Sequence, residues 1–362
     1  MLFHAILVWI LAFSMDIDSC CLDGNADAVE FCPHYPYHHV LAAATYNLKE
    51  GVEPSRQGSL SVYSAWADTG LELLNRVEMA GIFDVKWRPC VDDAGPVVAQ
   101  ADAEGFLRLH ALQCGGSDVN ADGISLRDIG AENVTSSMCL CLDWHPLGTS
   151  ISLGLSNGSI AVVTLQESQP HISQTWQAHD YEVWATSFDN HQPQLLYTGS
   201  DDCRLSCWDL RENPSKPVFN DAKSHKMGVC CITKVPTDSN MLLTGSYDEF
   251  LRVWDVRSAS KPLSQSSISL GGGVWRLKIH PCISDFVLAA CMHNGFAIAK
   301  IRSGVAEVVE TYKNHGSLAY GADWQKGECS TQGGAKRGSL VATCSFYDQL
   351  LRIWIPGTNV MV

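Results

Sequence analysis

A short pattern recurs along the second half of the chain at nearly constant spacing. Three segments, which begin at Tyr197, Leu243 and Thr343, each read as a strand, a tight turn that contains an aspartate, and a second strand that contains a tryptophan. Their sequences are YTGSDDCRLSCWDLR, LTGSYDEFLRVWDVR and TCSFYDQLLRIW. A unit this short cannot bury its apolar face alone, so a chain built from such units must stack them.

Weaker copies of the same outline extend the repeat toward the N-terminus and into the gap before the last strong copy. They lie at 58–63, 105–110, 158–163 and 295–300. The positions equivalent to the tryptophan are then 63, 110, 163, 208, 254, 300 and 354, with consecutive differences between 45 and 54 residues. A period near 45 with a Trp-Asp ending is typical of WD40 repeats, which are about 40–45 residues long and supply four strands each.

A second recurring element marks the innermost strand of each unit. The segments VKWRP (85–89), LDWHP (142–146) and LKIHP (277–281) each end an alternating or apolar run in proline, which cannot continue a sheet ladder. Seven units predict an all-β fold, a seven-bladed WD40-type β-propeller closed by the N-terminal strand at about 16–22. We expect one propeller over 15–362, with an insertion loop near 326–338.

Each strong repeat also carries a set of polar residues that imitates a catalytic constellation. The three sets are His179, Thr198, Asp202 and Trp208; His225, Thr244, Asp248 and Trp254; and His315, Thr343, Asp348 and Trp354. In a WD repeat such residues form a buried hydrogen-bonded network, and buried polar groups are normally paired for packing reasons. We therefore expect a structural role for all three sets.

The first fourteen residues, MLFHAILVWILAFS, are apolar but too few to span a hydrocarbon core of about 30 Å. They could form the core of a signal peptide, yet no Lys or Arg precedes them. We interpret 1–14 as an extension outside the fold and predict a cytoplasmic protein without a membrane partner. A secreted propeller is the alternative.

The charge balance argues against one class of partner. Lys plus Arg number 25 and Asp plus Glu number 39, so the net charge is −14. A nucleic-acid-binding protein needs a basic face to neutralise phosphates. We therefore expect no nucleic-acid partner.

Two local motifs invite a catalytic or metal-binding interpretation that the surrounding sequence does not support. The segment GLSNG (154–158) matches G-x-S-x-G, but a nucleophile elbow needs a helix after the serine, and Asn-Gly predicts a hairpin turn instead. The segment PHYPYHH (33–39) holds three histidines without a carboxylate at a matching spacing, so we interpret it as a surface loop.

Propellers bind ligands at the mouth of the central channel, where loops enter the inner strands and turns leave the next strands. Residues that are unusual for a plain WD repeat gather at these places: Glu182, Trp184, Met227, Tyr247, Trp275, Arg276, His293, Tyr320 and Tyr347. Such residues suit a peptide-binding rim, because Trp, Tyr and Arg dominate interface hot spots. They equally suit a catalytic site with a His or Glu base and groups that stabilise an anion.

The strings WQAHDYEVW, HKMGVCCI, TGSYDEFLRVWDVR, GGGVWRLKIHP, LAACMHNGF, YGADW and ATCSFYDQLLRIW occur in this order between 176 and 354. With them the chain resembles the diphthine methylesterase family, WD-repeat proteins of diphthamide biosynthesis, over about 16–354 and more loosely in the first three blades. The resemblance implies a cytosolic carboxylic ester hydrolase whose protein substrate is translation elongation factor 2, and we expect a monomer. The family hydrolyses the methyl ester of methylated diphthine, and no cofactor or metal is implied.

The chemistry of that substrate suggests roles for the residues at the mouth. Aromatic faces bind a trimethylammonium group well, and the candidates here are Trp184, Tyr247, Trp275, Tyr320 and Tyr347, with Met227 beside them. His293 is the first candidate for the general base and Glu182 the second. Arg276 could hold the carbonyl oxygen or form a structural ion pair. The alternative function is a non-catalytic WD40 adaptor that binds modified elongation factor 2 or scaffolds another enzyme.

Overall fold

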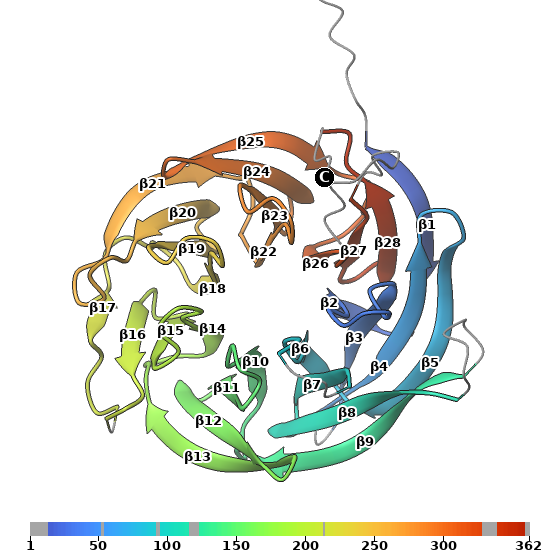
Figure 1. Ribbon diagram of the computed structural model, residues 1–362, viewed down its shortest axis with the longest axis horizontal. Helices are drawn as coiled ribbons and strands as arrows, with labels where there is room; N and C mark the ends of the chain where they lie inside the picture. Colours follow the sequence, from blue (N-terminus) through green and yellow to red (C-terminus); the bar gives the residue numbers. More distant parts are fainter. Residues whose placement is uncertain are drawn as a thin grey trace, which may run out of the picture.

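The computed structural model describes residues 14–51, 54–91, 95–115, 123–212, 214–327 and 339–358. Nearly all of the predicted extension 1–14 and most of the predicted insertion 326–338 lie outside the described residues, so both stay predictions. The described residues form seven four-stranded antiparallel sheets. Figure 1 shows these sheets as blades arranged around one central axis. The seven-bladed propeller predicted from the repeat is confirmed.

The blades follow one another along the chain. The first three comprise β2 (Asn25–Phe31), β3 (Val40–Lys49), β4 (Ser55–Trp66), β5 (Gly70–Ala80), β6 (Ile82–Trp87), β7 (Val97–Asp102), β8 (Phe106–Cys114), β9 (Ile124–Asn133), β10 (Cys139–Trp144), β11 (Ser150–Leu155), β12 (Ser159–Gln166) and β13 (Gln169–Gln177). The next three comprise β14 (Val183–Phe188), β15 (Leu195–Ser200), β16 (Leu205–Asp209), β17 (Phe219–Asp221), β18 (Val229–Lys234), β19 (Met241–Ser246), β20 (Phe250–Asp255), β21 (Leu263–Ser269), β22 (Arg276–Ile279), β23 (Phe286–Ala290), β24 (Phe296–Arg302) and β25 (Val305–Tyr312). The last blade combines β26 (Ala319–Trp324), β27 (Val341–Ser345) and β28 (Leu350–Ile355) with β1 (Met15–Cys21).

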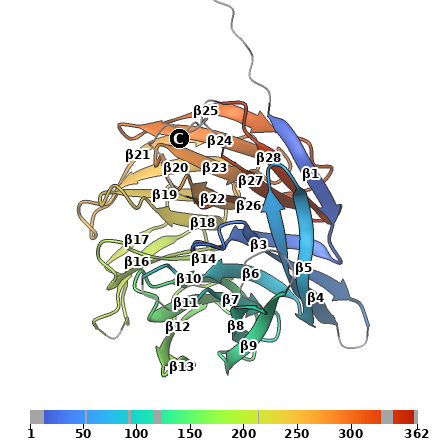
Figure 2. The ribbon, with the colours of Figure 1, turned by 45° about the vertical axis from the view of Figure 1, so that its right-hand side comes forward.

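The last blade joins the two ends of the described chain. Strand β1 pairs antiparallel with β28, from Met15 opposite Ile355 to Cys21 opposite Leu350. Figure 2 shows β1 lying along β28 at the edge of this blade. The predicted closure by the N-terminal strand is thus confirmed, and a closed ring leaves only short sheet edges. No helix among the described residues is long and apolar enough to cross a membrane.

The innermost strands are held together by side chains that reach between blades. The channel-facing edge of such a strand would otherwise leave backbone N–H groups unpaired. The Trp87 backbone N–H donates to the Glu30 carboxylate at 2.7 Å, and the Trp87 indole N–H donates to the Glu30 carbonyl at 3.0 Å. The Trp144 indole donates in the same way to the Lys86 carbonyl at 2.9 Å. This repeated contact explains why tryptophan recurs at the end of several inner strands.

The first polar set forms the expected buried network. The Thr198 hydroxyl accepts a hydrogen bond from the Trp208 indole at 2.9 Å and bonds His179 Nε2 at 2.8 Å. His179 Nδ1 lies 2.9 Å from the Asp202 carboxylate. Every member is engaged inside the blade, so the predicted structural role is confirmed for this set.

The second set departs from that pattern at its aspartate. His225 Nε2 and the Trp254 indole both bond the Thr244 hydroxyl at 2.9 Å. Asp248, however, pairs with Arg252 at 2.7 Å, and His225 Nδ1 has no hydrogen-bond partner among the described residues. The expectation of a complete four-residue network is therefore wrong here, because an arginine on β20 takes the carboxylate.

In the third set the histidine is connected to the aspartate through a serine hydroxyl. His315 Nε2 bonds the Thr343 hydroxyl at 2.9 Å, and the Trp354 indole donates to the same hydroxyl at 3.2 Å. The Ser345 hydroxyl bonds both His315 Nδ1 and the Asp348 carboxylate. The set is structural as predicted, with a serine inserted between histidine and aspartate.

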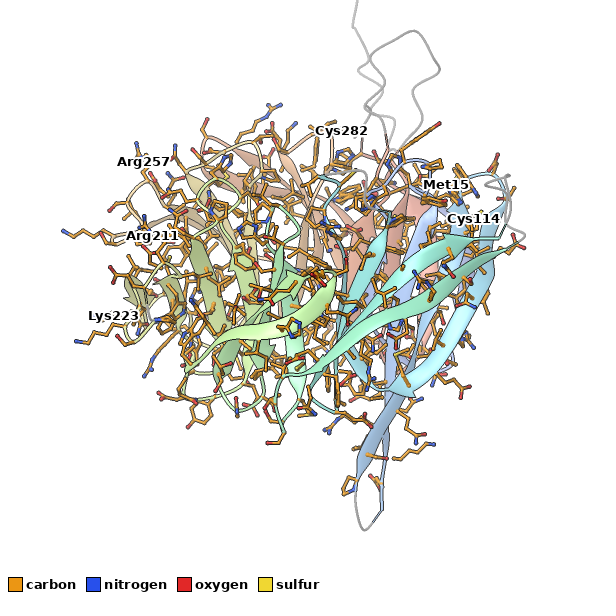
Figure 3. The ribbon with its side chains drawn as sticks, turned by 60° about the horizontal axis from the view of Figure 1, so that its bottom comes forward. Met15, Cys114, Arg211, Lys223, Arg257 and Cys282 are labelled. Atoms are coloured by element: carbon orange, nitrogen blue, oxygen red, sulfur yellow. The ribbon has the colours of Figure 1, made fainter. Side chains whose placement is uncertain are left out.

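The Asp-x-Arg endings of two strong repeats form ion pairs whose arginines are exposed at the surface. Arg211 pairs with Asp209, and Arg257 pairs with Asp255, each at 2.5 Å. Figure 3 shows Arg211 and Arg257 projecting into solvent at one side of the molecule, with Lys223 nearby. Exposed pairs of this kind add little to stability.

The G-x-S-x-G segment lies at a hairpin, as expected. Ser156 is in the turn between β11 and β12, and its hydroxyl accepts a hydrogen bond from the Met138 backbone N–H at 3.0 Å. Gly158 adopts a φ of +84°, which glycine reaches without steric cost. The serine therefore lacks the strand-to-helix setting of a hydrolase nucleophile.

Candidate functional site

Six innermost strands carry a β-bulge near their first residue. The pairing with the second strand of the blade skips one residue at Asp27, Phe83, Leu140, Trp184, Cys230 and Tyr320. Trp275 holds the same place in the remaining blade, directly before β22. A bulge leaves the extra residue unpaired and re-aims its side chain. These seven residues are called the bulge positions below.

The bulge positions meet at the central axis. A small cavity is lined by Asp27, Phe83, Leu140, Cys141, Trp184, Cys230, Trp275 and Arg276. Each of the first six blades therefore contributes one bulge position to this cavity, and the sixth does so through Trp275. The scaffold therefore turns one side chain per blade toward the mouth of the channel.

An arc of aromatic side chains follows the same mouth. It comprises Trp184, Trp275, Tyr320, Phe346, Tyr46 and Phe83, and neighbouring ring centroids lie 4.8–5.2 Å apart. The structure therefore brings together three residues that the sequence predicted: Trp184, Trp275 and Tyr320. Tyr347 touches the arc edge-on, with its ring centroid 4.9 Å from that of Phe346, but it is 71% exposed.

Three members of this aromatic arc were missed by sequence reasoning. Phe83 and Tyr46 belong to the first two blades, where the repeat is weak, and Phe346 was passed over in favour of its neighbour Tyr347. The available signal was positional, since Phe83 aligns with Trp184 as a bulge residue.

Asp27, also missed by sequence reasoning, places a carboxyl group within this aromatic surrounding. Asp27 is only 3% exposed, and its Oδ1 atom has no hydrogen-bond partner among the described residues. Burial raises the pKa of this carboxyl to about 8; the nearby Arg276 opposes the rise and Asp84 adds to it. A buried acid that titrates near neutral pH is a common feature of functional sites.

Arg276 forms an ion pair with Asp84, with Nη1 3.0 Å from Oδ1, and both side chains are largely buried. The other oxygen of Asp84 accepts a hydrogen bond from the Leu142 backbone N–H at 3.1 Å. Of the two roles considered for Arg276, the structural pair is the one that the geometry displays. This pair also lines a cavity of about 460 Å³ between the inner strands, together with further pairs such as Lys86 with Asp143.

A third cavity opens at the surface between the loops of two neighbouring blades. It has a volume of about 490 Å³ and is lined by Tyr181, Glu182, Asp201, Cys203, Lys226, Met227, Gly228 and Tyr247. Three predicted residues, Glu182, Met227 and Tyr247, therefore lie together in what we call the outer cavity. Burial raises the pKa of Asp201, and a hydrogen bond from Trp184 opposes that rise, which links this cavity to the aromatic arc.

The two predicted bases come from different blades. Glu182 lines the outer cavity, whereas His293 is exposed in the turn between β23 and β24 and is not among the residues lining either cavity at the mouth. Within the described ranges, no group of three or more His, Cys, Asp or Glu side chains is placed to hold a metal ion. The catalytic roles of Glu182 and His293 stay predictions.

Comparisons with known proteins point to one family. The model "WD domain, G-beta repeat" matches residues 171–209 and 217–255. "Diphthine methyltransferase" of Mus musculus is 35% identical over 83% of this chain and 67% of its own length. The protein of the same name from Homo sapiens is 33% identical (83% and 72%), and that from Schizosaccharomyces pombe is 32% identical (88% and 91%).

A solved structure supports the fold independently. A chain of the "Crystal Structure of Mitotic Checkpoint Complex" superposes with a TM-score of 0.70 and covers 98% of this chain and 96% of its own. Its sequence identity is 16%, so the likeness concerns the propeller alone.

Proposed function

The chain belongs to the diphthine methyltransferase family of WD-repeat proteins, and we propose that it hydrolyses the methyl ester of methylated diphthine on translation elongation factor 2. This reaction is a step of diphthamide biosynthesis. It removes a methyl group as methanol and leaves a free carboxylate. The enzyme is then a cytoplasmic carboxylic ester hydrolase with a protein substrate.

The observation that carries the proposal is the aromatic arc around a buried carboxyl group. A trimethylammonium cation is attracted to the faces of Trp and Tyr, by about 2 kcal/mol or more where water is excluded. Trp184, Trp275 and Tyr320 are half-buried and in contact with one another, as such a binding site requires. The methylated diphthine group carries this cation close to its ester, so both would sit at the channel mouth.

The rim would hold the polypeptide around the modified histidine. Met227 is 46% exposed and Tyr247 is 43% exposed, and both border the outer cavity with Glu182. Partly exposed aromatic and methionine side chains are suited to a peptide contact. We assign His293 and Tyr347, which are exposed in turns of other blades, to the same rim.

Turnover of the authentic substrate tests the proposal. The purified chain is incubated with elongation factor 2 that carries the methylated intermediate, and the modified peptide is followed by mass spectrometry. Loss of one methyl group with retention of the trimethylammonium supports the esterase. A parallel reaction with unmethylated diphthine and S-adenosylmethionine tests methyl transfer, the activity in the relatives' names. A gain of methyl there, or binding with no change of mass in either reaction, would contradict the proposal; the latter result favours the adaptor.

A further inference from the structure

The proposed hydrolysis needs a group that takes a proton from the attacking water, and we infer that this group is the carboxylate of Asp27. The inference rests on the proposed function and assigns a catalytic residue that the sequence motifs do not indicate. Asp27 is the only carboxylic acid among the seven bulge positions, whose other members are Phe83, Leu140, Trp184, Cys230, Trp275 and Tyr320.

The bonding of Asp27 differs from that of the other carboxylates of the inner strands. Glu30 accepts the Trp87 backbone N–H and pairs with Lys278 at 2.6 Å. Asp84 is likewise engaged through both of its oxygens. The Asp27 carboxyl has a hydrogen bond from Trp275, but its Oδ1 atom is buried without a partner among the described residues, which is unfavourable for a polar atom. A fold that keeps such an atom at a channel mouth leaves it available to a ligand or a reacting molecule.

The space beside Asp27 fits the nucleophile. The cavity that it lines has a volume of about 10 Å³. A single water needs roughly 10–15 Å³ by this measure. Trp184 and Trp275 line this cavity and also belong to the aromatic arc, so a water held by Asp27 lies next to the place proposed for the trimethylammonium.

The charged and titratable groups around Asp27 come from several blades. They are Arg276 on β22, Asp84 on β6, Tyr46 on β3, Tyr320 on β26 and Cys344 on β27. Burial raises the pKa of the Asp27 carboxyl to about 8, against the opposing charge of Arg276. General bases work best when their pKa lies near the operating pH.

The reaction balances with water as the only co-reactant. The carboxylate of Asp27 takes one proton from water while the water oxygen forms a bond to the ester carbonyl carbon. The tetrahedral intermediate then collapses, the bond from carbon to the methoxy oxygen breaks, and the leaving methoxide takes the proton from Asp27. The products are methanol and a carboxylic acid, which ionises in solution, and Asp27 returns to its starting state.

The test is the pH dependence of turnover of methylated elongation factor 2 by the full chain and by Asp27→Asn. Asparagine keeps the size of the side chain but cannot accept the proton. We expect kcat to fall by about 10²–10⁴-fold, the usual contribution of a general base, with KM changed by less than about threefold. In the wild type, kcat/KM should rise with pH, reach half of its maximum near pH 8 and level off above about pH 9, because kcat/KM reports the ionisation of the free enzyme. This rise should be absent from the residual activity of the variant.

Asp128→Asn provides the matched control, because Asp128 is exposed on β9, an outer strand away from the mouth. It should leave kcat and its pH profile unchanged. Glu182→Gln and His293→Ala should change KM more than kcat. Thermal unfolding of each variant shows whether it is folded, and the wild-type profile gives the answer independently if Asp27→Asn does not fold.

Three outcomes are distinct. Two results would overturn the role of Asp27 while the esterase stands. One is an active wild type whose kcat/KM is flat between pH 6 and 9, and the other is a folded Asp27→Asn variant whose kcat is within about threefold of wild type. A collapse of kcat in Glu182→Gln or His293→Ala but not in Asp27→Asn would move the base to the rim. No turnover by wild type would sink the proposed function itself.

Discussion

Burial of Asp27 should make the folded protein progressively less stable as pH rises through neutrality. The carboxyl has a pKa of about 8 in the fold, against an ordinary value of 3.8. Between these values the native state therefore binds more protons than the unfolded state. Stability falls with rising pH wherever that is so, and the stabilising effect of protonation is complete below about pH 4 and lost above about pH 8.

The size of the effect follows from the same two values. The shift spans about 4 pH units, and each unit corresponds to about 1.4 kcal/mol, so the limiting effect is on the order of 6 kcal/mol. Partial rehydration of the carboxylate weakens this limit, because buried sites respond as if their effective dielectric constant were well above that of dry protein. We expect Asp27→Asn to gain at least about 2 kcal/mol relative to wild type between pH 5 and pH 8.

Guanidinium unfolding at pH 5, 6, 7 and 8 measures the difference between the two proteins. The comparison between proteins is needed because buried histidines such as His225 and His315, whose pKa values are lowered to about 4, make wild-type stability rise between pH 4 and 6.5. The control is Asp209→Asn, whose carboxylate has a lowered pKa because Arg211 bonds it on the surface. Its difference from wild type should be constant above pH 5.

A difference between Asp27→Asn and wild type that does not change with pH would refute the reasoning. It would mean that the Asp27 carboxylate is solvated or paired in the native state. A difference that shrinks as pH rises would require the opposite proton balance, with a carboxylate stabilised by Arg276.

Three further predictions follow from other parts of the structure. Trp254→Ala should lower the free energy of unfolding by about 3–5 kcal/mol, because Trp254 is 2% exposed and its indole bonds Thr244. Leu263→Ala on the exposed edge should change it by less than about 0.5 kcal/mol, and chemical denaturation measures both variants. Trp275→Ala should raise KM for methylated elongation factor 2 by about 30-fold, the equivalent of the roughly 2 kcal/mol of a desolvated cation–π contact, and Trp66→Ala on β4 should not. Equal KM values for the two variants would contradict the aromatic site. His225 should titrate with a pKa of about 4 by NMR, because burial and the charge of Arg252 disfavour its protonated form; protonation at pH 6 would show that the ring is solvated.

The sequence predicted the architecture well because the repeat encodes it redundantly. The third strand of each blade contains the residue aligned with Trp254, and the strand that closes the ring, β1, was located within about a residue at each end. Each blade repeats one solution to the same packing problem, so an uncertain unit is fixed by its neighbours. The error at Asp248 arose because a single arginine, Arg252, changes one polar network without disturbing the blade.

The site was predicted less completely, because its residues do not carry the repeat signal. Trp184, Trp275 and Tyr320 were found since tryptophan and tyrosine are conspicuous near strong repeats. Asp27 belongs to the sequence NADAVEF in a blade without the Trp-Asp ending, and nothing in its local sequence distinguishes it from a surface aspartate. Its burial depends on six other blades, which no local pattern contains.

Alignment of the inner strands offers a more general approach to such a site. The bulge gives every blade one side chain at the mouth that is free from the pairing of the sheet, so its chemistry can vary without altering the blade. In this chain the bulge positions hold a carboxyl, a thiol, an aliphatic residue and four aromatic rings. A propeller with only apolar residues there would have an apolar core at the channel mouth. One carboxyl among aromatic rings is instead costly to bury in its charged form, so burial raises its pKa. The local cost at Asp27 is the physical reason to look for function at this position rather than in the hydrogen-bonded sets of the WD repeats, whose polar groups largely satisfy one another.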